Sequence, residues 1–257
     1  MKYLWFYVAA LLTMGAVGHA TIIQQEDFPP SQAGTLPSTM DAQWDAGTDV
    51  IVTDLATVVV PVDHPGGDGY VLRLGDLGAG GGGYNFAFPS DYQTASETDN
   101  SVAAWVYFDF PTTNTLERDY GLIIRCQPDP GGGVYPLRAG YWLLVTNNSS
   151  WGSYVPLNFR AFLLKRVSGT WSQIGTAGVN DYTTGWHRLE LVSIGAEVRG
   201  YVDGNLECAA TDSDYAAGFP VMVRYDDEGV DPDFFAASFD NFLWSKPNTA
   251  VSEWSIY

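Results

Sequence analysis

The sequence has only two cysteines and three histidines in 257 residues. Zinc sites need three or four Cys, His or acidic ligands at short spacings, and these few residues match none of the usual patterns. Basic residues are also scarce, since 12 Lys and Arg stand against 30 Asp and Glu and give a net charge of −18. Nucleic acids and anionic lipids bind basic patches. We therefore expect no nucleic-acid partner and no membrane insertion of the mature domain.

Long apolar runs are absent except at the N-terminus, where Lys2 precedes an apolar stretch over residues 4–17 that ends in Gly18-His19-Ala20. This stretch is shorter than the roughly 20 residues that a membrane-spanning helix needs. A basic start, a short apolar centre and small residues at the −3 and −1 positions are typical of a secretory signal peptide. We predict a signal peptide over residues 1–20 and a secreted or cell-surface protein. Loss of Lys2 would change the net charge from −18 to −19.

The two cysteines, Cys126 and Cys208, allow one cross-link. In an oxidising compartment a disulfide between them would close a long loop and stabilise the fold by about 4–5 kcal/mol. The alternative is a pair of buried thiols in neighbouring strands, because cysteine is common in β cores. We predict the disulfide and keep the thiols as the alternative.

Helical periodicity is also missing from the mature chain, which instead has short β-branched and aromatic runs between Gly, Pro, Asn and Asp turns. Residues 185–194 and 196–202 alternate in polarity on either side of Gly195-Ala196, and Asp203-Gly204 ends the second run. A period of two predicts half-buried antiparallel strands joined by tight turns. The same criteria predict further strands at 21–27, 50–62, 70–74, 101–110, 120–126, 140–146, 159–167, 171–174, 220–225 and 234–244.

Roughly a dozen strands with little helix predict an all-β protein, in which two antiparallel sheets form a jelly-roll sandwich around one core. We expect a single domain over residues 21–246, with a polar loop between residues 28 and 44 and a tail from residue 247. The glycine run at 78–83 lacks a following Gly-Lys-Ser/Thr and a helix. It therefore indicates a surface loop and no phosphate site.

Three segments carry a resemblance to a known family: GWHRLEL at 185–191, GYVDG at 200–204 and FDNF at 239–242. They resemble the concanavalin A-like lectin/glucanase superfamily, and within it the laminin-G-like and related sugar-binding domains of secreted bacterial proteins. The resemblance covers most of residues 21–246 and implies a concanavalin A-like jelly roll. Such folds include lectins, carbohydrate-binding modules, glycosidases, lyases and adhesion domains, so the resemblance implies a fold more than an activity.

The resemblance has two further implications. Jelly-roll sugar-binding modules often hold one structural Ca²⁺ where the first and last strands meet, which implies Glu26 and Asp240 as ligands here, since Ca²⁺ prefers oxygen donors. The C-terminal segment with Ser252-Glu253-Trp254 is similar to the opening of a bacterial sorting signal, which implies a truncated signal at 247–257.

The glucanases of this superfamily carry Glu-x-Asp-x-x-Glu on one strand, which places carboxylates on both sides of a sugar. The nearest string here, Glu97-Thr98-Asp99, lacks the third acid and lies in a polar segment. We therefore predict no catalytic residue. A glucanase-like or 3-keto-disaccharide hydrolase activity remains the alternative.

Aromatic residues make up 14% of the chain, and exposed rings with nearby polar groups are typical of sugar-binding sites. We predict carbohydrate-binding residues in one group, namely Trp142, Trp151, Tyr154, Asn147 and Arg125.

Strand alternation favours core positions for Trp105, Trp142 and Trp186. Trp151, which polar and small residues flank, is therefore the strongest candidate for an exposed platform. Tyr84, Tyr92 and Tyr182 are expected in loops.

Together these features predict a secreted carbohydrate-binding, lectin-like domain without catalytic activity, at a cell surface or in a matrix. Two alternatives remain open: a glycoside-active enzyme, and a structural or adhesive surface protein.

Overall fold

The computed structural model describes residues 20–44, 50–54, 70–74, 83–90, 97–108, 118–127, 139–147, 159–226 and 237–247. Within these ranges the chain forms fifteen strands and one short 3-10 helix, η1 (Pro30–Gln32), with no α-helix. Every strand pair is antiparallel. The all-β prediction is confirmed. Residues 1–19 of the predicted signal peptide and the tail beyond Pro247 lie outside the described residues, and no helix among those described could cross a membrane.

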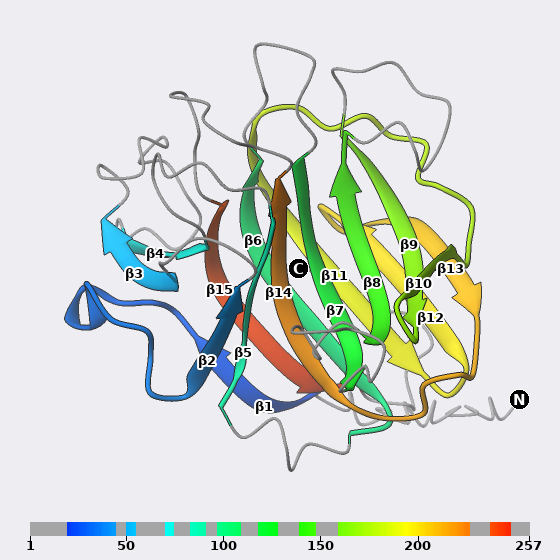
Figure 1. Ribbon diagram of the computed structural model, residues 1–257, viewed down its shortest axis with the longest axis horizontal. Helices are drawn as coiled ribbons and strands as arrows, with labels where there is room; N and C mark the ends of the chain where they lie inside the picture. Colours follow the sequence, from blue (N-terminus) through cyan, green and yellow to red (C-terminus); the bar gives the residue numbers. More distant parts are fainter. Residues whose placement is uncertain are drawn as a thin grey trace, which may run out of the picture.

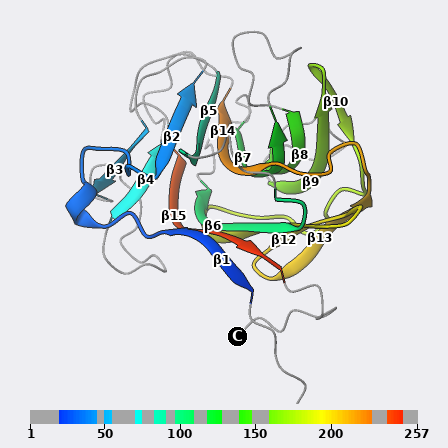
Figure 2. The same ribbon diagram turned by 90° about the horizontal axis from the view of Figure 1, so that it is seen from below.

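The strands form two sheets that face each other (Figures 1 and 2). Sheet A has eight strands. Seven of them lie in the order β13 (Asn205–Thr211), β12 (Glu197–Val202), β11 (Gly185–Ile194), β6 (Asn100–Phe108), β15 (Ala237–Lys246), β4 (Tyr70–Leu74) and β3 (Val50–Asp54), and β1 (Thr21–Glu26) pairs with β15. Sheet B has seven strands in the order β10 (Thr170–Gln173), β9 (Arg160–Val167), β8 (Ala139–Thr146), β7 (Arg118–Gln127), β14 (Phe219–Asp226), β5 (Gly83–Pro89) and β2 (Met40–Trp44). The two-sheet sandwich is therefore confirmed.

Two of the hairpins have tight turns of two residues with positive φ. Ser168 and Gly169 join β9 to β10 with φ values of 48° and 80°, and Asp203 and Gly204 join β12 to β13 with 51° and 77°. Two consecutive residues with positive φ are typical of a type I′ turn, whose twist matches that of the flanking strands. The predicted meander through β11 and β12 is confirmed with its alternation, because Leu189 is fully buried and the neighbouring Glu190 is not.

Three strands lie where no strand was predicted: β2, which falls inside the predicted polar loop, β5 and β13. β2 and β13 are edge strands, each paired on one side only in their sheets. Edge strands need fewer apolar residues than central strands do. β2 reads MDAQW and β13 reads NLECAAT, so polar residues interrupt the apolar ones in both short strands.

The core between the sheets is formed by alternate residues of facing strands. Tyr120 on β7 contacts Phe108 on β6, with ring centroids 5.3 Å apart, and Leu189 and Leu191 on β11 are fully buried in the same layer. The sheets approach closely at Gly200, where an added Cβ would lie 2.6 Å from Cδ1 of Leu143.

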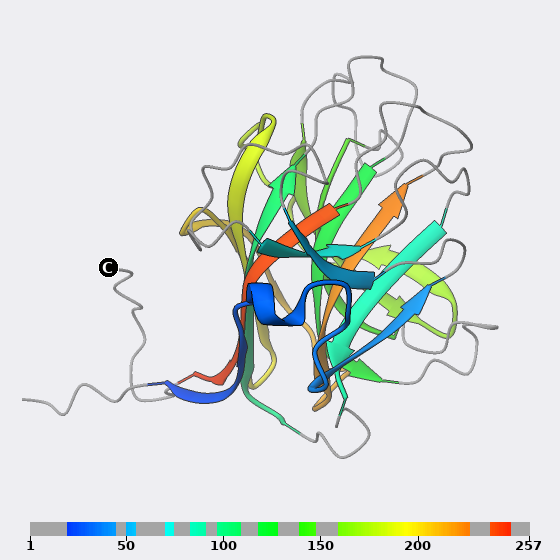
Figure 3. The same cartoon turned by 90° about the vertical axis from the view of Figure 1, so that its left-hand side faces the viewer.

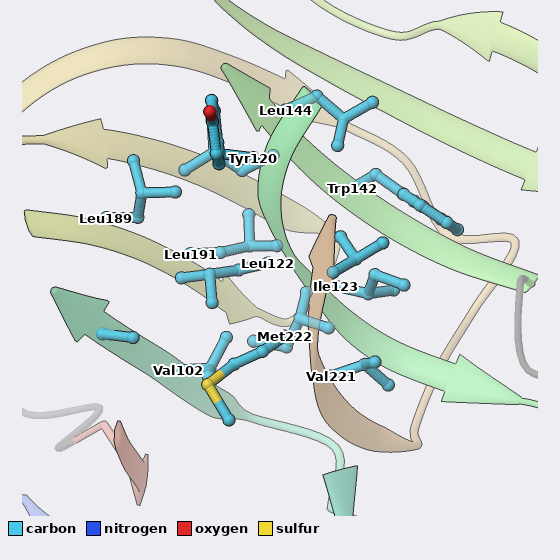
Figure 4. Close-up of a cluster of buried hydrophobic side chains, with 14 of the residues drawn as sticks. Val102, Tyr120, Leu122, Ile123, Trp142, Leu144, Leu189, Leu191, Val221 and Met222 are labelled. Carbon is cyan, nitrogen blue, oxygen red and sulfur yellow. The ribbon is translucent and has the colours of Figure 1, made fainter. Parts of the chain in front are cut away.

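Sheet B is also apolar on the face that points away from sheet A. Strand register aligns Val221, Ile123, Trp142 and Leu164 in one row across four strands, and all four are fully buried. Figure 4 shows Trp142 on the opposite side of the sheet from Leu189 and Leu191. Sheet B therefore has two apolar faces, whereas half-exposed polar residues alternate with core residues in β11 and β12 of sheet A.

The structure contradicts the predicted disulfide, because both cysteines are buried thiols. Cys208 on β13 donates to the Ala161 carbonyl oxygen on β9 (3.4 Å), whereas Cys126 lies on β7, two strands further along sheet B. Two strand spacings amount to roughly 10 Å, and disulfides need Cα atoms within about 7 Å. The thiols are buried, as the alternative predicted, but they lie on strands of different sheets and not on neighbouring strands.

Thiol titration tests this result. Burial raises the pKa of the Cys208 thiol to about 12, so we expect it not to react with a disulfide reagent at pH 8 in the native protein. Denaturant without reductant should expose two reactive thiols per chain. A count of zero in denaturant would show that the disulfide forms.

Candidate functional site

The predicted calcium ligands lie on neighbouring strands but on opposite faces of sheet A. The first and last strands pair as expected (Figure 3), with Glu26 opposite Phe242, a core residue. Asp240 instead lies opposite Trp105, which points away from the core. The register shifts between Asp240 and Leu243, where Asn241 has a φ of 50°, and such a β-bulge moves the next side chain to the other face.

Hydrogen bonds already engage both carboxylates. Glu26 accepts from Thr39, and Asp240 Oδ1 accepts from the Asn241 amide at 2.7 Å. Among the described residues no three His, Cys, Asp or Glu side chains gather as metal ligands would. The pair does not fit one calcium site.

The string that resembles a glucanase motif holds the two sheets together at one end of the sandwich. Asp99 accepts from the Gly195 amide (2.8 Å) and lies 3.7 Å from Arg125, while Glu97 forms an ion pair of 2.6 Å with Lys246. The string is a structural connection.

Arg125, predicted to bind sugar, is 1% exposed. Its Nε donates to the Thr98 carbonyl at 2.8 Å and its Nη1 to the Tyr215 carbonyl at 2.9 Å. Burial lowers its pKa, although Tyr141 and Asp99 act in the opposite direction. Arg125 therefore fixes the segment before β14 and offers no face to a ligand.

A second polar cluster fixes the same segment. Asp212 accepts from Tyr141 Oη (2.7 Å), from Lys165 and from the Asp214 amide (2.9 Å). Burial raises the pKa of Tyr141 to about 12. Burial disfavours the charged forms of Asp212 and Lys165 too, but their mutual hydrogen bonds outweigh it, so the pKa of Asp212 is lowered and that of Lys165 is raised to about 12.

These shifts predict how stability depends on pH. The Asp212 contribution is present above the ordinary aspartate pKa of about 3.9 and is lost as the pH falls below it. The Lys165 contribution is present below the ordinary lysine pKa of about 10.4 and is lost as the pH rises toward 12.

Asp212→Asn should lower the free energy of unfolding at pH 7 by about 2 kcal/mol in urea titrations. Asp214→Asn, at a 55% exposed side chain, should change it by less than about 1 kcal/mol; equal effects would contradict this assignment.

Five aromatic rings form one group on the outward face of sheet B, which we term the aromatic platform: Tyr84, Phe86, Trp142, Trp171 and Tyr225. Tyr84 lies at its centre, with ring centroids 4.5 Å from Tyr225, 5.8 Å from Phe86, 5.8 Å from Trp142 and 6.3 Å from Trp171. Trp142 and Trp171 are themselves 4.6 Å apart. Phe86 and Trp142 are fully buried, whereas the other three rings are half-buried. The platform therefore has a buried base and a partly accessible upper layer.

The platform lies on a concave surface. β5 and β10, which carry Tyr84 and Trp171, are five strand spacings apart in sheet B. In a flat sheet five spacings would separate them by roughly 24 Å, yet the two rings are 6.3 Å apart. Sheet B therefore curves toward this face.

Polar groups lie beside the platform. The Arg166 guanidinium is 5.2 Å from the centroid of Trp171, a cation–π contact. Tyr225 on β14 is paired with Asp119 on β7, and Asp119 is paired with Thr146 on β8, so the three side chains lie on the same face of the sheet. Arg166, Asp119 and Thr146 are all buried, so these polar side chains lie beside the rings beneath the accessible layer of the platform.

Only part of the predicted sugar-binding group belongs to this platform. Trp142 belongs to it as a buried base, and Asn147 is half-buried at the end of β8, where its Oδ1 accepts from the Arg118 amide (2.7 Å). Trp151 and Tyr154 lie outside the described residues, so their part in binding stays a prediction.

Several aromatic residues lie where the sequence did not place them. Tyr84 lies on β5 and not in a loop. Tyr182 lies in the connection between β10 and β11, as predicted, but is buried, and Tyr92 is not among the described residues. Trp105 and Trp186, expected in the core, are half-buried on the outward face of sheet A, where Trp186 contacts Tyr107 at 5.5 Å.

Sequence reasoning did not include Trp171, Tyr225 and Phe86 in the site. The signal for them is the unbroken apolar run in β7, β8, β9 and β14, such as YWLLV at 141–145. Such runs are typical of strands buried on both faces. They indicate a second apolar face on sheet B.

No family model matches the sequence, and neither does any curated protein. Solved structures are similar in fold. The exoplasmic/lumenal domain of VIP36, in its Ca²⁺-bound form, aligns with a TM-score of 0.58 and 11% identity over 90% of this chain and 93% of that one. The CBM2 module of the evolved Dit protein of Lactobacillus casei BL23 phage J-1 aligns with a TM-score of 0.52 and 10% identity over 91% and 98%. At these identities the likeness shows a shared sandwich fold.

Proposed function

We propose that the chain is a secreted carbohydrate-binding domain, and that the aromatic platform of sheet B is its binding surface. The observation that carries this proposal is the group of half-buried rings, Tyr84, Trp171 and Tyr225, on a concave sheet face. Aromatic rings pack on the apolar faces of pyranoses, and neighbouring polar side chains bind the hydroxyl groups. The shared fold with the CBM2 module of the phage protein supports the same function.

The domain binds sugar without transforming it. Glycoside hydrolysis needs two carboxyl groups on opposite sides of the scissile bond, and Glu97 and Asp99 are engaged in structural contacts. The calcium site expected at Glu26 and Asp240 is not part of this proposal, since the two side chains lie on opposite faces.

A glycan array tests the function directly. The mature chain should bind a restricted set of oligosaccharides or polysaccharides, with and without added Ca²⁺. An array that stays empty under both conditions would overturn the proposal and favour the adhesive alternative. Turnover of any bound glycan at enzyme-like rates, followed by reducing-end release, would favour the hydrolase alternative.

A further inference from the structure

His187, at the start of β11, lies between two hydrogen-bond partners on different parts of the chain. Its Nδ1 is 2.8 Å from Oδ2 of Asp203, in the β12–β13 turn, and its Nε2 is 3.0 Å from the carbonyl oxygen of Thr183, in the β10–β11 connection. The imidazole ring is stacked on Phe108 at 4.6 Å and meets the edge of Tyr182 at 5.4 Å. The ring is thus fixed in position by contacts on several sides.

Both partners of the ring can only accept hydrogen bonds. A peptide carbonyl has no proton to donate, and an ionised carboxylate has none either. Burial disfavours the charge on Asp203, but the hydrogen bonds from His187 and the Arg188 amide outweigh it, and the pKa of this carboxyl group is lowered. A neutral imidazole has one N–H and would leave its other nitrogen lone pair facing an acceptor. Only the imidazolium form, with two N–H groups, makes both contacts.

Several other ionisable groups lie around the ring. Asp203 faces it from the β12–β13 turn, and Glu207 on β13 and the hydroxyl of Tyr182 lie in the same group. The Arg188 side chain is paired with Glu190 at 2.7 Å.

Thr183 belongs to the β10–β11 connection, which closes one side of the sandwich. The β10–β11 connection runs along the edges of both sheets: Gly178 N donates to the Ala161 carbonyl on β9 (2.8 Å), and an added Cβ at Gly175 would lie 2.7 Å from the Ala209 carbonyl on β13. Tyr182 and Phe159 exchange two backbone hydrogen bonds, of 2.8 and 3.2 Å. This connection therefore spans the gap between the edge strands.

We propose that His187 is a pH-dependent clasp, which as an imidazolium ties the β10–β11 connection to the β12–β13 turn and on deprotonation releases the connection. Histidine is the side chain that ordinarily changes charge between about pH 5 and 8. As the pH rises, the neutral ring keeps the bond to Asp203 and loses the bond to Thr183. The sandwich edge is then closed more loosely. This inference does not depend on carbohydrate binding.

Native-state hydrogen exchange measures the clasp. Between pH 5.5 and 8, after correction for intrinsic exchange rates, protection of the Gly178 and Tyr182 amides should fall about tenfold relative to that of Leu191, as loss of one charge-assisted hydrogen bond implies. His187→Gln should show low protection at both pH values. His64→Gln, a change at the other histidine of the mature chain, should behave as the wild type does.

Two results would overturn the clasp: relative protection that does not change with pH in the wild type, or a change that persists in His187→Gln. If His187→Gln does not fold, ¹⁵N NMR of the wild-type imidazole decides the question. Two protonated ring nitrogens for His187 at pH 5.5 support the clasp, and a neutral tautomer at that pH refutes it.

Discussion

Gly121→Ala is expected to destabilise the protein by about 3 kcal/mol or more, at the upper end of the range for overpacking. The added Cβ would lie 2.4 Å from the carbonyl oxygen of Leu143 and 2.6 Å from Cδ2 of Leu144. The carbonyl belongs to β8, which is paired with β7 on one side and β9 on the other, so it cannot move without breaking a sheet. Urea unfolding of the purified variant measures the change.

Gly200→Ala is the matched control. There the added Cβ would meet Cδ1 of Leu143 at 2.6 Å, and this atom is the end of a side chain. Side chains adjust more readily than a paired backbone, so we expect a loss of about 1–2 kcal/mol. A Gly121→Ala protein as stable as Gly200→Ala would contradict the packing of β7 against β8.

Trp142→Ala is expected to lower the free energy of unfolding by about 3–5 kcal/mol, the usual range for truncating a buried aromatic residue. Trp142 is fully buried and contacts Tyr84, Phe86 and Trp171, so its removal leaves a cavity beneath the platform. Thermal and urea unfolding measure the loss.

The contrast with Trp171→Ala makes this prediction specific. Trp171 is half-buried, so its truncation should lower stability by less than about 2 kcal/mol. A loss for Trp142→Ala no larger than that for Trp171→Ala would mean that the outward face of sheet B is not packed as described.

The sheet architecture could be predicted from local sequence because its signals are local. Alternation about Glu190, together with the turn residues Asp203 and Gly204, predicts both the strands of the meander and the reversal between them. The edge strands β2 and β13 were not predicted in this way, since both are short and polar residues interrupt their apolar ones.

The site could be predicted only in part, because its geometry depends on features that one strand does not reveal. The bulge at Asn241 places Asp240 and Glu26 on opposite faces, and no composition signal marks a single extra residue. Tyr84 and Trp171 meet because sheet B is curved. Trp142 was expected to be buried, and it is, but on the face of sheet B that points away from the core between the sheets.

The most direct test of the aromatic platform compares two tryptophan variants on the two outward faces of the sandwich. Trp171 belongs to the platform on sheet B, and Trp186 is a half-buried tryptophan on sheet A. Calorimetric titration with the best glycan from the array should give at least about tenfold weaker binding for Trp171→Ala, as for an aromatic hot spot, and an unchanged affinity for Trp186→Ala. Unchanged affinity in Trp171→Ala, with loss in Trp186→Ala, would contradict the platform and place binding on sheet A.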